Sequence, residues 1–136
     1  MVKVDGTEVR EGLYYTKDFE WAKIEGDKVR IGATDYAQKQ LREIVYAELP
    51  SPGTTITQNT PYGTVESVKA VSDLIAPISG EILEVNQAVQ SKPELLNEDP
   101  YGKAWLLVLK PSNLQAELPN LMDFNKSVEW HKTLGK

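Results

Sequence analysis

Apolar and polar residues alternate along the first third of the chain, a pattern typical of β-strands. Phe19, Trp21 and Ile24 alternate with polar residues, and an acidic turn that contains a glycine divides the segment. This pattern predicts a β-hairpin with strands at about 19–25 and 28–33.

Residues 34–44 change to a helical period, because apolar side chains recur there every three or four positions. Thr34 or Asp35, followed by Gln38, supplies an N-cap signal. We expect a short helix over about residues 35–42 that interrupts the strands.

The remaining β-prone runs are short and are separated by turn residues. They predict strands at about 45–49, 54–57, 64–68, 70–76, 80–86 and 104–110. Residues 92–97 are interpreted as at most a helical turn, and the polar residues 1–12 as an arm laid against the body. Apolar residues set between charges predict an amphipathic helix over about 120–134, packed on the β body. The sequence therefore indicates a mainly β fold.

A short internal repeat indicates two related halves. Pro61-Tyr-Gly63 recurs as Pro100-Tyr-Gly102, each time just before an expected strand. We interpret the repeat as two β halves related by a pseudo-twofold axis. Lys69 would then lie at the crossing between them, at the tip of a hairpin.

Composition limits the function classes. A chain of 136 residues fits one domain, and a formal net charge of −5 argues against binding to nucleic acid, which needs a basic face. Because there is no cysteine, disulfides and thiolate chemistry are excluded, and a reducing compartment is compatible. No segment has the apolar run of a signal peptide or of a membrane span, so we expect a soluble cytoplasmic protein.

Signatures of a self-sufficient enzyme are missing. The single histidine, His131, is interpreted as a surface or packed residue, because one histidine without cysteine does not make a transition-metal site. Glycine-rich phosphate loops do not occur, and the 20 acidic residues form no recognisable acid–base pair by spacing. We therefore expect a non-catalytic protein.

Lys69 lies between two short β-prone runs, in the segment Glu66-Ser-Val-Lys69-Ala-Val-Ser-Asp73, which is followed by Pro77-Ile-Ser-Gly80-Glu-Ile and Val85-Asn86. These segments resemble the lipoyl-attachment region of the glycine cleavage system H protein family. The resemblance continues in unbroken order over about residues 13–110, through segments 15–21, 31–38, 41–50 and 97–106.

The resemblance implies a flattened β-barrel, or barrel-sandwich hybrid, of the lipoyl and biotinyl carrier type, with short helices and a C-terminal helix. Residues 1–136 would form a single lipoyl-carrier domain. Lys69 would carry lipoate through an amide bond, which changes the formal net charge from −5 to −6. Val68 and Ala70 flank this lysine, whereas methionines typically flank the lysine of biotin carriers, so the resemblance favours lipoate.

The family also implies partners. A pyridoxal-phosphate glycine decarboxylase loads an aminomethyl group onto the lipoyl arm, a folate-dependent aminomethyltransferase removes it, and dihydrolipoyl dehydrogenase reoxidises the arm. A lipoate ligase or transferase attaches the arm. We expect a monomeric carrier that serves these enzymes without binding nucleic acid or a membrane.

The loaded arm of an H protein rests in a cleft, where an acidic residue pairs with its ammonium. Glu20 stands at the family's acidic position, and Asp73 lies where a second carboxylate commonly helps. Such a pair contributes on the order of 1 kcal/mol when partly desolvated and less when exposed. The alternative is that Glu20 is only the outward residue of an alternating strand.

Some positions depart from the family. Phe19 replaces the usual histidine before Glu-Trp, Gln40 stands where some members have a histidine, and the tail has Trp130 and Lys132 in place of a tyrosine-rich ending. These departures leave the cargo open. H-protein-like carriers also serve a heterodisulfide-reductase-like sulfur oxidation system, and others act in lipoate relay.

An alternative from another class is an unmodified β-barrel interaction module, in which Lys69 is an ordinary exposed turn lysine that blunts a strand edge. The tail helix is a candidate docking surface, and plain packing of that helix is the simpler interpretation.

Overall fold

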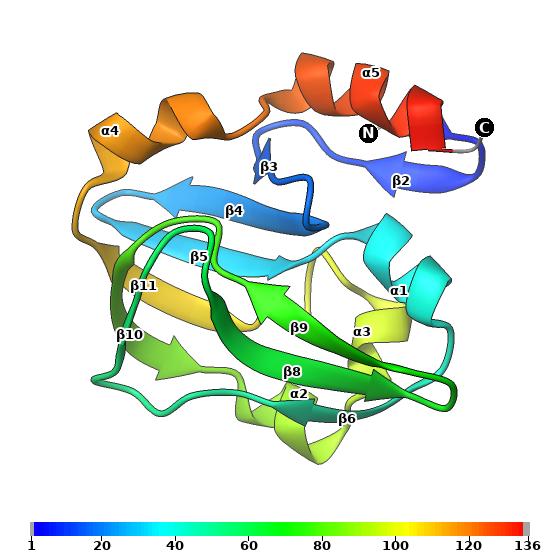
Figure 1. Cartoon of the computed structure of the whole chain (residues 1–136), viewed down its shortest axis with the longest axis horizontal. Coiled ribbons are helices and arrows are strands. Elements are labelled where there is room, and N and C mark those ends of the chain that lie inside the picture. Colours follow the sequence, from blue (N-terminus) through cyan, green and yellow to red (C-terminus); the bar gives the residue numbers. More distant parts are fainter. Residues whose placement is uncertain (1, 135–136) are drawn as a thin grey trace.

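Antiparallel β-strands in three sheets form most of the computed structural model, which describes residues 2–134 (Figure 1). The largest sheet has the order β3 (Tyr14–Tyr15), β4 (Glu20–Glu25), β5 (Lys28–Ala33), β11 (Leu107–Pro111), β10 (Gly80–Val85) and β7 (Thr55–Ile56). The second sheet has the order β6 (Ile44–Glu48), β8 (Pro61–Ser67) and β9 (Val71–Ile75). The third is a hairpin of β1 (Val2–Val4) and β2 (Thr7–Val9).

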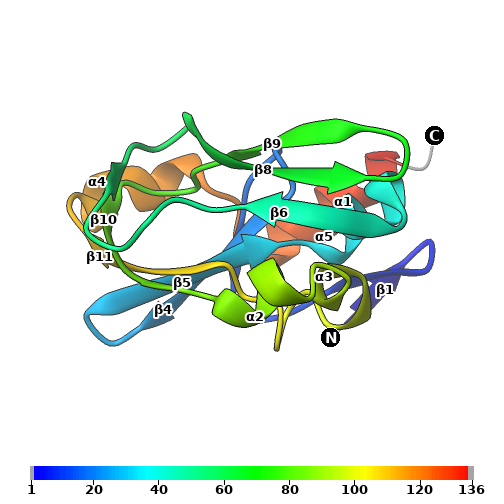
Figure 2. The ribbon, with the colours of Figure 1, turned by 90° about the horizontal axis from the view of Figure 1, so that it is seen from below.

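The two larger sheets lie over one another, as Figure 2 shows for β8 and β9 above β4 and β5. Their inward side chains form the main core, in which Ile31, Ile78 and Leu107 are fully buried. Within residues 2–134 the sheets do not close into a continuous hydrogen-bonded barrel, and the edge strands β3 and β7 have only two residues each. The predicted mainly β fold with short helices and a C-terminal helix is confirmed, in the form of an open, flattened sandwich.

Short helices lie at the ends of the strands. They are α1 (Asp35–Leu41), α2 (Gln87–Ser91), α3 (Leu95–Glu98), α4 (Leu114–Glu117), the 3-10 turn η1 (Leu118–Asn120) and α5 (Phe124–Leu134). Thr34 is the N-cap of α1, because its hydroxyl accepts a hydrogen bond from the Ala37 amide at 3.2 Å. Of the two predicted cap residues, Asp35 instead occupies the first turn.

The hairpin predicted at 19–25 and 28–33 is confirmed as β4 and β5, with Gly26 in the left-handed conformation that a tight turn requires. Strand β11 begins at Leu107 rather than at 104, because residues 99–104 form a turn closed by the Ala104 amide on the Asp99 carbonyl at 3.1 Å. Helix α2, which the sequence did not predict, begins at the Asn86 cap.

The internal repeat does not mark equivalent positions. Pro61–Gly63 lies inside β8, whereas Pro100–Gly102 belongs to a turn several residues before β11. The interpretation that each copy directly precedes a strand is therefore wrong. The two sheets also differ in strand number, six against three.

The chain ends pack together. The arm expected over residues 1–12 is, from residue 2 on, the β1–β2 hairpin, against which α5 packs (Figure 1). Val9, Tyr15 and Trp21 form a second apolar cluster there, with Val128 of α5 packed against it. His131 is a packed residue at 3% exposure, with Nδ1 2.7 Å from the Ser127 carbonyl oxygen. The packing expected for the tail helix is confirmed.

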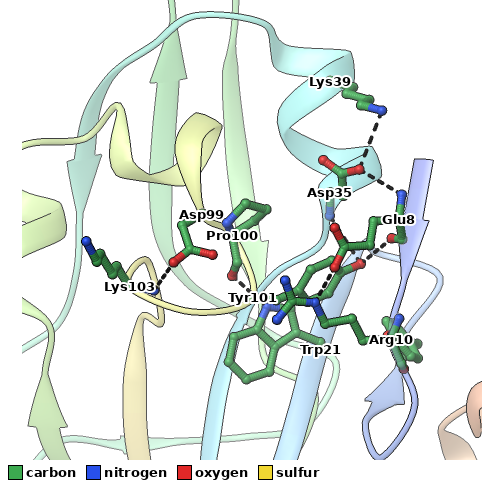
Figure 3. A network of polar contacts seen from close by, with 10 residues as sticks. Glu8, Arg10, Trp21, Asp35, Lys39, Asp99, Pro100, Tyr101 and Lys103 are labelled. Carbon is green, nitrogen blue, oxygen red and sulfur yellow. Dashed lines mark hydrogen bonds and ion pairs between the residues drawn. The ribbon is translucent and has the colours of Figure 1, made fainter. Parts of the chain in front are cut away.

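A polar network joins this second cluster to α1 (Figure 3). The Tyr101 hydroxyl donates to the Glu8 carbonyl at 2.8 Å, and the Glu8 amide donates to Asp35 Oδ2 at 2.8 Å. Trp21 Nε1 donates to the Pro100 carbonyl at 3.0 Å, in a contact between residues far apart in sequence. These bonds fix the start of α1 relative to β4. Across residues 2–134, no helix has the length and apolarity needed to cross a membrane.

Candidate functional site

Lys69 lies at the tip of the β8–β9 hairpin, as the sequence predicted. The Ser67 amide donates to the Ala70 carbonyl at 2.8 Å and closes the turn. The Ser67 hydroxyl also accepts from the amides of Lys69 and Ala70 at 3.3 and 3.1 Å. A serine that satisfies its own turn in this way stiffens the loop. The backbone that carries Lys69 is therefore held by four consecutive residues.

The tip is exposed and unusually apolar. Lys69 is exposed, and Val68 and Val71 on either side are 66% and 65% exposed. Among residues 2–134 the Lys69 ammonium has no carboxylate partner. Val45 and Tyr46 of β6 are also about half exposed. Exposed valines beside a free amine provide apolar surface that a partner protein can cover.

A cavity of about 160 Å³ lies beside the hairpin, between α1, the start of β4 and strands β8 and β9. Its apolar walls are formed by Phe19, Ala33, Ala37, Leu41, Val65 and Leu74. Its polar residues are Asp18, Glu20, Gln40, Ser72 and Asp73. Figure 1 shows α1 and β9 next to each other at this edge of the molecule. The arrangement is a small, mainly apolar space whose wall includes three acidic residues.

Glu20 is the buried acid of this cavity, with 1% of its surface exposed. Its Oε1 accepts a hydrogen bond from the Tyr62 hydroxyl at 2.6 Å, whereas Oε2 is buried and has no hydrogen-bond partner among the described residues. Burial raises the pKa of Glu20 well above its ordinary value, the Tyr62 hydroxyl and the backbone amide of Ile75 lower it, and the nearby Asp18 carboxylate raises it. The interpretation of Glu20 as an outward strand residue is wrong, because β4 is covered on both faces at this position.

An unpartnered, buried carboxyl oxygen is costly unless something binds it. Because Glu20 lines the cavity, a ligand there that carries positive charge would lie beside this buried carboxyl group. Asp73 is exposed and lines the same cavity, and Asp18 adds a third carboxylate. These three acidic side chains, set in apolar walls, suit a cationic amine on an otherwise apolar stem.

Comparisons with known proteins agree with the family resemblance found in the sequence. The model of the glycine cleavage H-protein family matches residues 13–134. A probable glycine cleavage system H protein of Pyrococcus horikoshii is 51% identical over 135 residues, which covers 98% of this chain and 100% of the relative. The glycine cleavage system H protein of Geobacillus thermodenitrificans is 56% identical over 110 residues, or 81% of this chain and 86% of that protein.

The chain belongs to the glycine cleavage H-protein family. A crystal structure of the H protein from Mycobacterium marinum superposes with a TM-score of 0.82 and 36% identity, covering 93% of this chain and all of that one. The open sandwich is therefore the barrel-sandwich fold of this family. As a member, the chain is a carrier component rather than a catalyst, and the cofactor of the family is lipoate.

The cavity wall contains two of the residues that depart from the family. Gln40 lines the cavity, and so does Phe19, whose backbone has a φ of 67°, a left-handed conformation that is rare for a bulky residue. The Phe19 ring is stacked on the Trp130 ring of α5, with the ring centroids 5.3 Å apart, and its centroid lies 4.9 Å from that of the Tyr36 ring of α1. Phe19 thus makes the cavity wall apolar and ties it to the terminal helix.

The structure brings Glu20 and Asp73 to one cavity, although they are far apart in sequence. Lys69 does not line it, but Asp73 lies four residues further along the same hairpin, roughly 13 Å for extended backbone. An arm attached to Lys69 would therefore start one short strand away from the cavity. Sequence reasoning missed Tyr62, because no local pattern connects a strand tyrosine with an acid in the opposite sheet.

Proposed function

We propose that Lys69 is the lipoylated lysine of this H protein and that the protein carries the aminomethyl group of glycine between partner enzymes. The observation that supports this most directly is the exposed Lys69 on a serine-capped tip, one strand from a cavity with an unpartnered buried carboxyl. The partners would be a pyridoxal-phosphate glycine decarboxylase, a folate-dependent aminomethyltransferase, dihydrolipoyl dehydrogenase and a lipoate ligase or transferase.

When bound, lipoate would supply a disulfide that takes up the group and gives it back. This chain contributes the position and the environment. Residues 67–70 hold the root of the arm, and the apolar cavity walls exclude water from its head. Glu20 would accept a hydrogen bond from the ammonium of the cargo, and Asp73 would add negative charge. The carrier thereby protects a labile cationic group between enzymes.

The same geometry bears on the choice of cargo. A sulfur-oxidation carrier or a lipoate relay carrier would hold a group without an ammonium. A buried acid with one open oxygen has no partner in such a group, and its desolvation would remain uncompensated. The acidic cavity therefore favours the aminomethyl group. The cytoplasmic location and the monomeric state remain predictions.

The attachment site is tested by intact mass after expression with a lipoate ligase. We expect the wild-type chain to gain the mass of one lipoyl group, and Lys69→Arg to gain none. Lys28→Arg is a matched control, because Lys28 is also exposed beside a hairpin turn. Unmodified wild-type protein, or modification that persists in Lys69→Arg, would defeat this assignment and favour the unmodified interaction module.

The cargo is tested separately with the lipoylated protein. We expect it to support exchange between glycine and bicarbonate in the presence of its cognate glycine decarboxylase, and Lys28→Arg to do the same. A lipoylated chain that supports no exchange would favour the sulfur pathway or the relay role.

A further inference from the structure

Tyr62 lies at a β-bulge. The pairing of β8 with β9 runs from Pro61 opposite Ile75 to Gly63 opposite Leu74, so Tyr62 is an extra residue in β8. A bulge bends its strand and redirects a side chain. The backbone at Gly63 also passes close to β6, because a Cβ at this position would collide with the Glu48 carbonyl oxygen. The glycine therefore permits the local geometry that turns Tyr62.

The redirected side chain reaches across the sandwich. Tyr62 belongs to the three-stranded sheet and Glu20 to the six-stranded sheet, yet the hydroxyl and Oε1 are 2.6 Å apart. This distance lies at the short end for O–H···O bonds, where a charged acceptor strengthens the bond. The bond fixes one carboxyl oxygen and leaves the other, Oε2, unpartnered. Without the Tyr62 bond the carboxyl group could rotate about its terminal torsion, which is broad for glutamate.

We propose that Tyr62 is a positioning residue that fixes the Glu20 carboxyl in the cavity wall and stabilises its carboxylate when a protonated amine arrives. In the empty protein, burial favours the protonated form of Glu20. On arrival of the ammonium, the carboxyl O–H bond breaks, one proton leaves to solvent, and a carboxylate–ammonium pair remains. The identity of the amine as the aminomethyl group rests on the function proposed above.

The surrounding charges support this order of events. Burial raises the pKa of Glu20 and favours its neutral form, and the Asp18 carboxylate acts in the same direction. Asp73 is the third acid that lines the cavity. Burial raises the pKa of the Tyr62 hydroxyl as well, so it remains a donor. An ammonium beside the Glu20 carboxyl favours the ionised form of Glu20, because it is the one cation among these groups.

The first test uses the unlipoylated chain and does not depend on the proposed function. In protein labelled with ¹³C at glutamate carboxyls, the Glu20 resonance is identified by its loss in Glu20→Gln. We expect the Glu20 midpoint to lie above the ordinary range in wild type and to move to higher pH in Tyr62→Phe. Tyr15→Phe is the matched control. It also removes a tyrosine hydroxyl, but that hydroxyl donates to the backbone carbonyl of Arg10 and not to Glu20. An unchanged midpoint in Tyr62→Phe would overturn the inference.

The second test uses the lipoylated protein loaded with the aminomethyl group. At neutral pH we expect the Glu20 resonance to change from the protonated to the ionised position on loading. We expect the group to be lost about fivefold faster from Tyr62→Phe than from wild type or Tyr15→Phe, since one hydrogen bond contributes about 1 kcal/mol. A Glu20 that stays protonated in the loaded protein, or equal loss rates, would refute the positioning role. Failure of lipoylation at Lys69 would instead refute the proposed function and leave the first test intact.

Discussion

Asp35 is the first residue of α1 and Glu20 is the first residue of β4. The two acids differ in how many of their carboxyl oxygens are hydrogen-bonded. Asp35 Oδ2 accepts from the Glu8 amide at 2.8 Å (Figure 3), and Oδ1 accepts from Gln38 Nε2 at 2.7 Å. Glu20 has a partner on one oxygen and none on the other. Fully satisfied polar networks make a fold rigid, whereas an open acceptor carries a cost. Asp35 therefore has a structural role, whereas the open oxygen of Glu20 is the feature that the proposed function uses.

The largest effect on stability is expected from Asp35→Ala. The substitution leaves the Glu8 amide and the Gln38 side chain without acceptors, which should cost about 2–3 kcal/mol of unfolding free energy. Urea denaturation measures the loss. Asp35→Asn, which keeps one acceptor oxygen, should lose about half as much. The Glu20 titration should be the same in both variants; a shift there would show that the two regions are coupled and would break the comparison.

Glu20→Gln should behave in the opposite way. Because the folded-state pKa of Glu20 is raised above the ordinary value of 4.5, the folded protein keeps a proton that the unfolded chain releases. The stability of wild type is therefore full below that ordinary value, and it falls as pH rises toward the raised pKa, by up to about 1.4 kcal/mol per pH unit. Glutamine removes this slope and should make the empty protein more stable than wild type at neutral pH.

Thermal unfolding of wild type and Glu20→Gln at a series of pH values between 4 and 8 measures this difference, because only the part of the slope that disappears in the variant belongs to Glu20. Parallel curves for the two proteins would mean that the carboxyl is ionised in the folded state. The same variant should lose a bound aminomethyl group faster than wild type, so stability and retention change in opposite directions.

The smallest effect is expected from Asp73→Asn. Asp73 is exposed at the cavity, where solvent screens its charge. Retention of the aminomethyl group should fall by no more than about two- to fivefold, and the effect should shrink as salt is added. Loss rates measured at low and high ionic strength check this. An effect larger than that of Glu20→Gln would place the dominant acid at Asp73.

The sequence predicted what is local or follows from the family resemblance. The first hairpin turns between Glu25 and Lys28, at its glycine, and α1 follows Thr34 because the hydroxyl of this residue caps the helix. The position of Lys69 on a hairpin tip was also predicted. These features depend on neighbouring residues, and the sequence records them directly.

Features set by long-range contacts were not predicted. Helix α2 starts at Asn86, whose side-chain amide also donates to the carbonyls of Lys103 and Trp105, at 2.8 and 2.6 Å, and no local pattern reveals those acceptors. The burial of Glu20 depends on the opposite sheet. Its partner Tyr62 is turned inward by a bulge, and a one-residue bulge shifts the strand alternation from which burial is inferred.

The serine-capped turn at Ser67 has a consequence for the kinetics of a tethered group. An arm rooted in a mobile loop would spread its head over the volume swept by loop and arm together. Because one hydroxyl holds the amides of Lys69 and Ala70, the root of an arm attached to Lys69 would be a fixed point, and the arm alone would set the volume. A smaller volume means a higher effective concentration of the head at its own cavity and at any active site docked on the tip. The Ser67 hydroxyl would thereby raise the frequency with which the head of the arm meets its own cavity, and also the frequency with which it meets a docked active site.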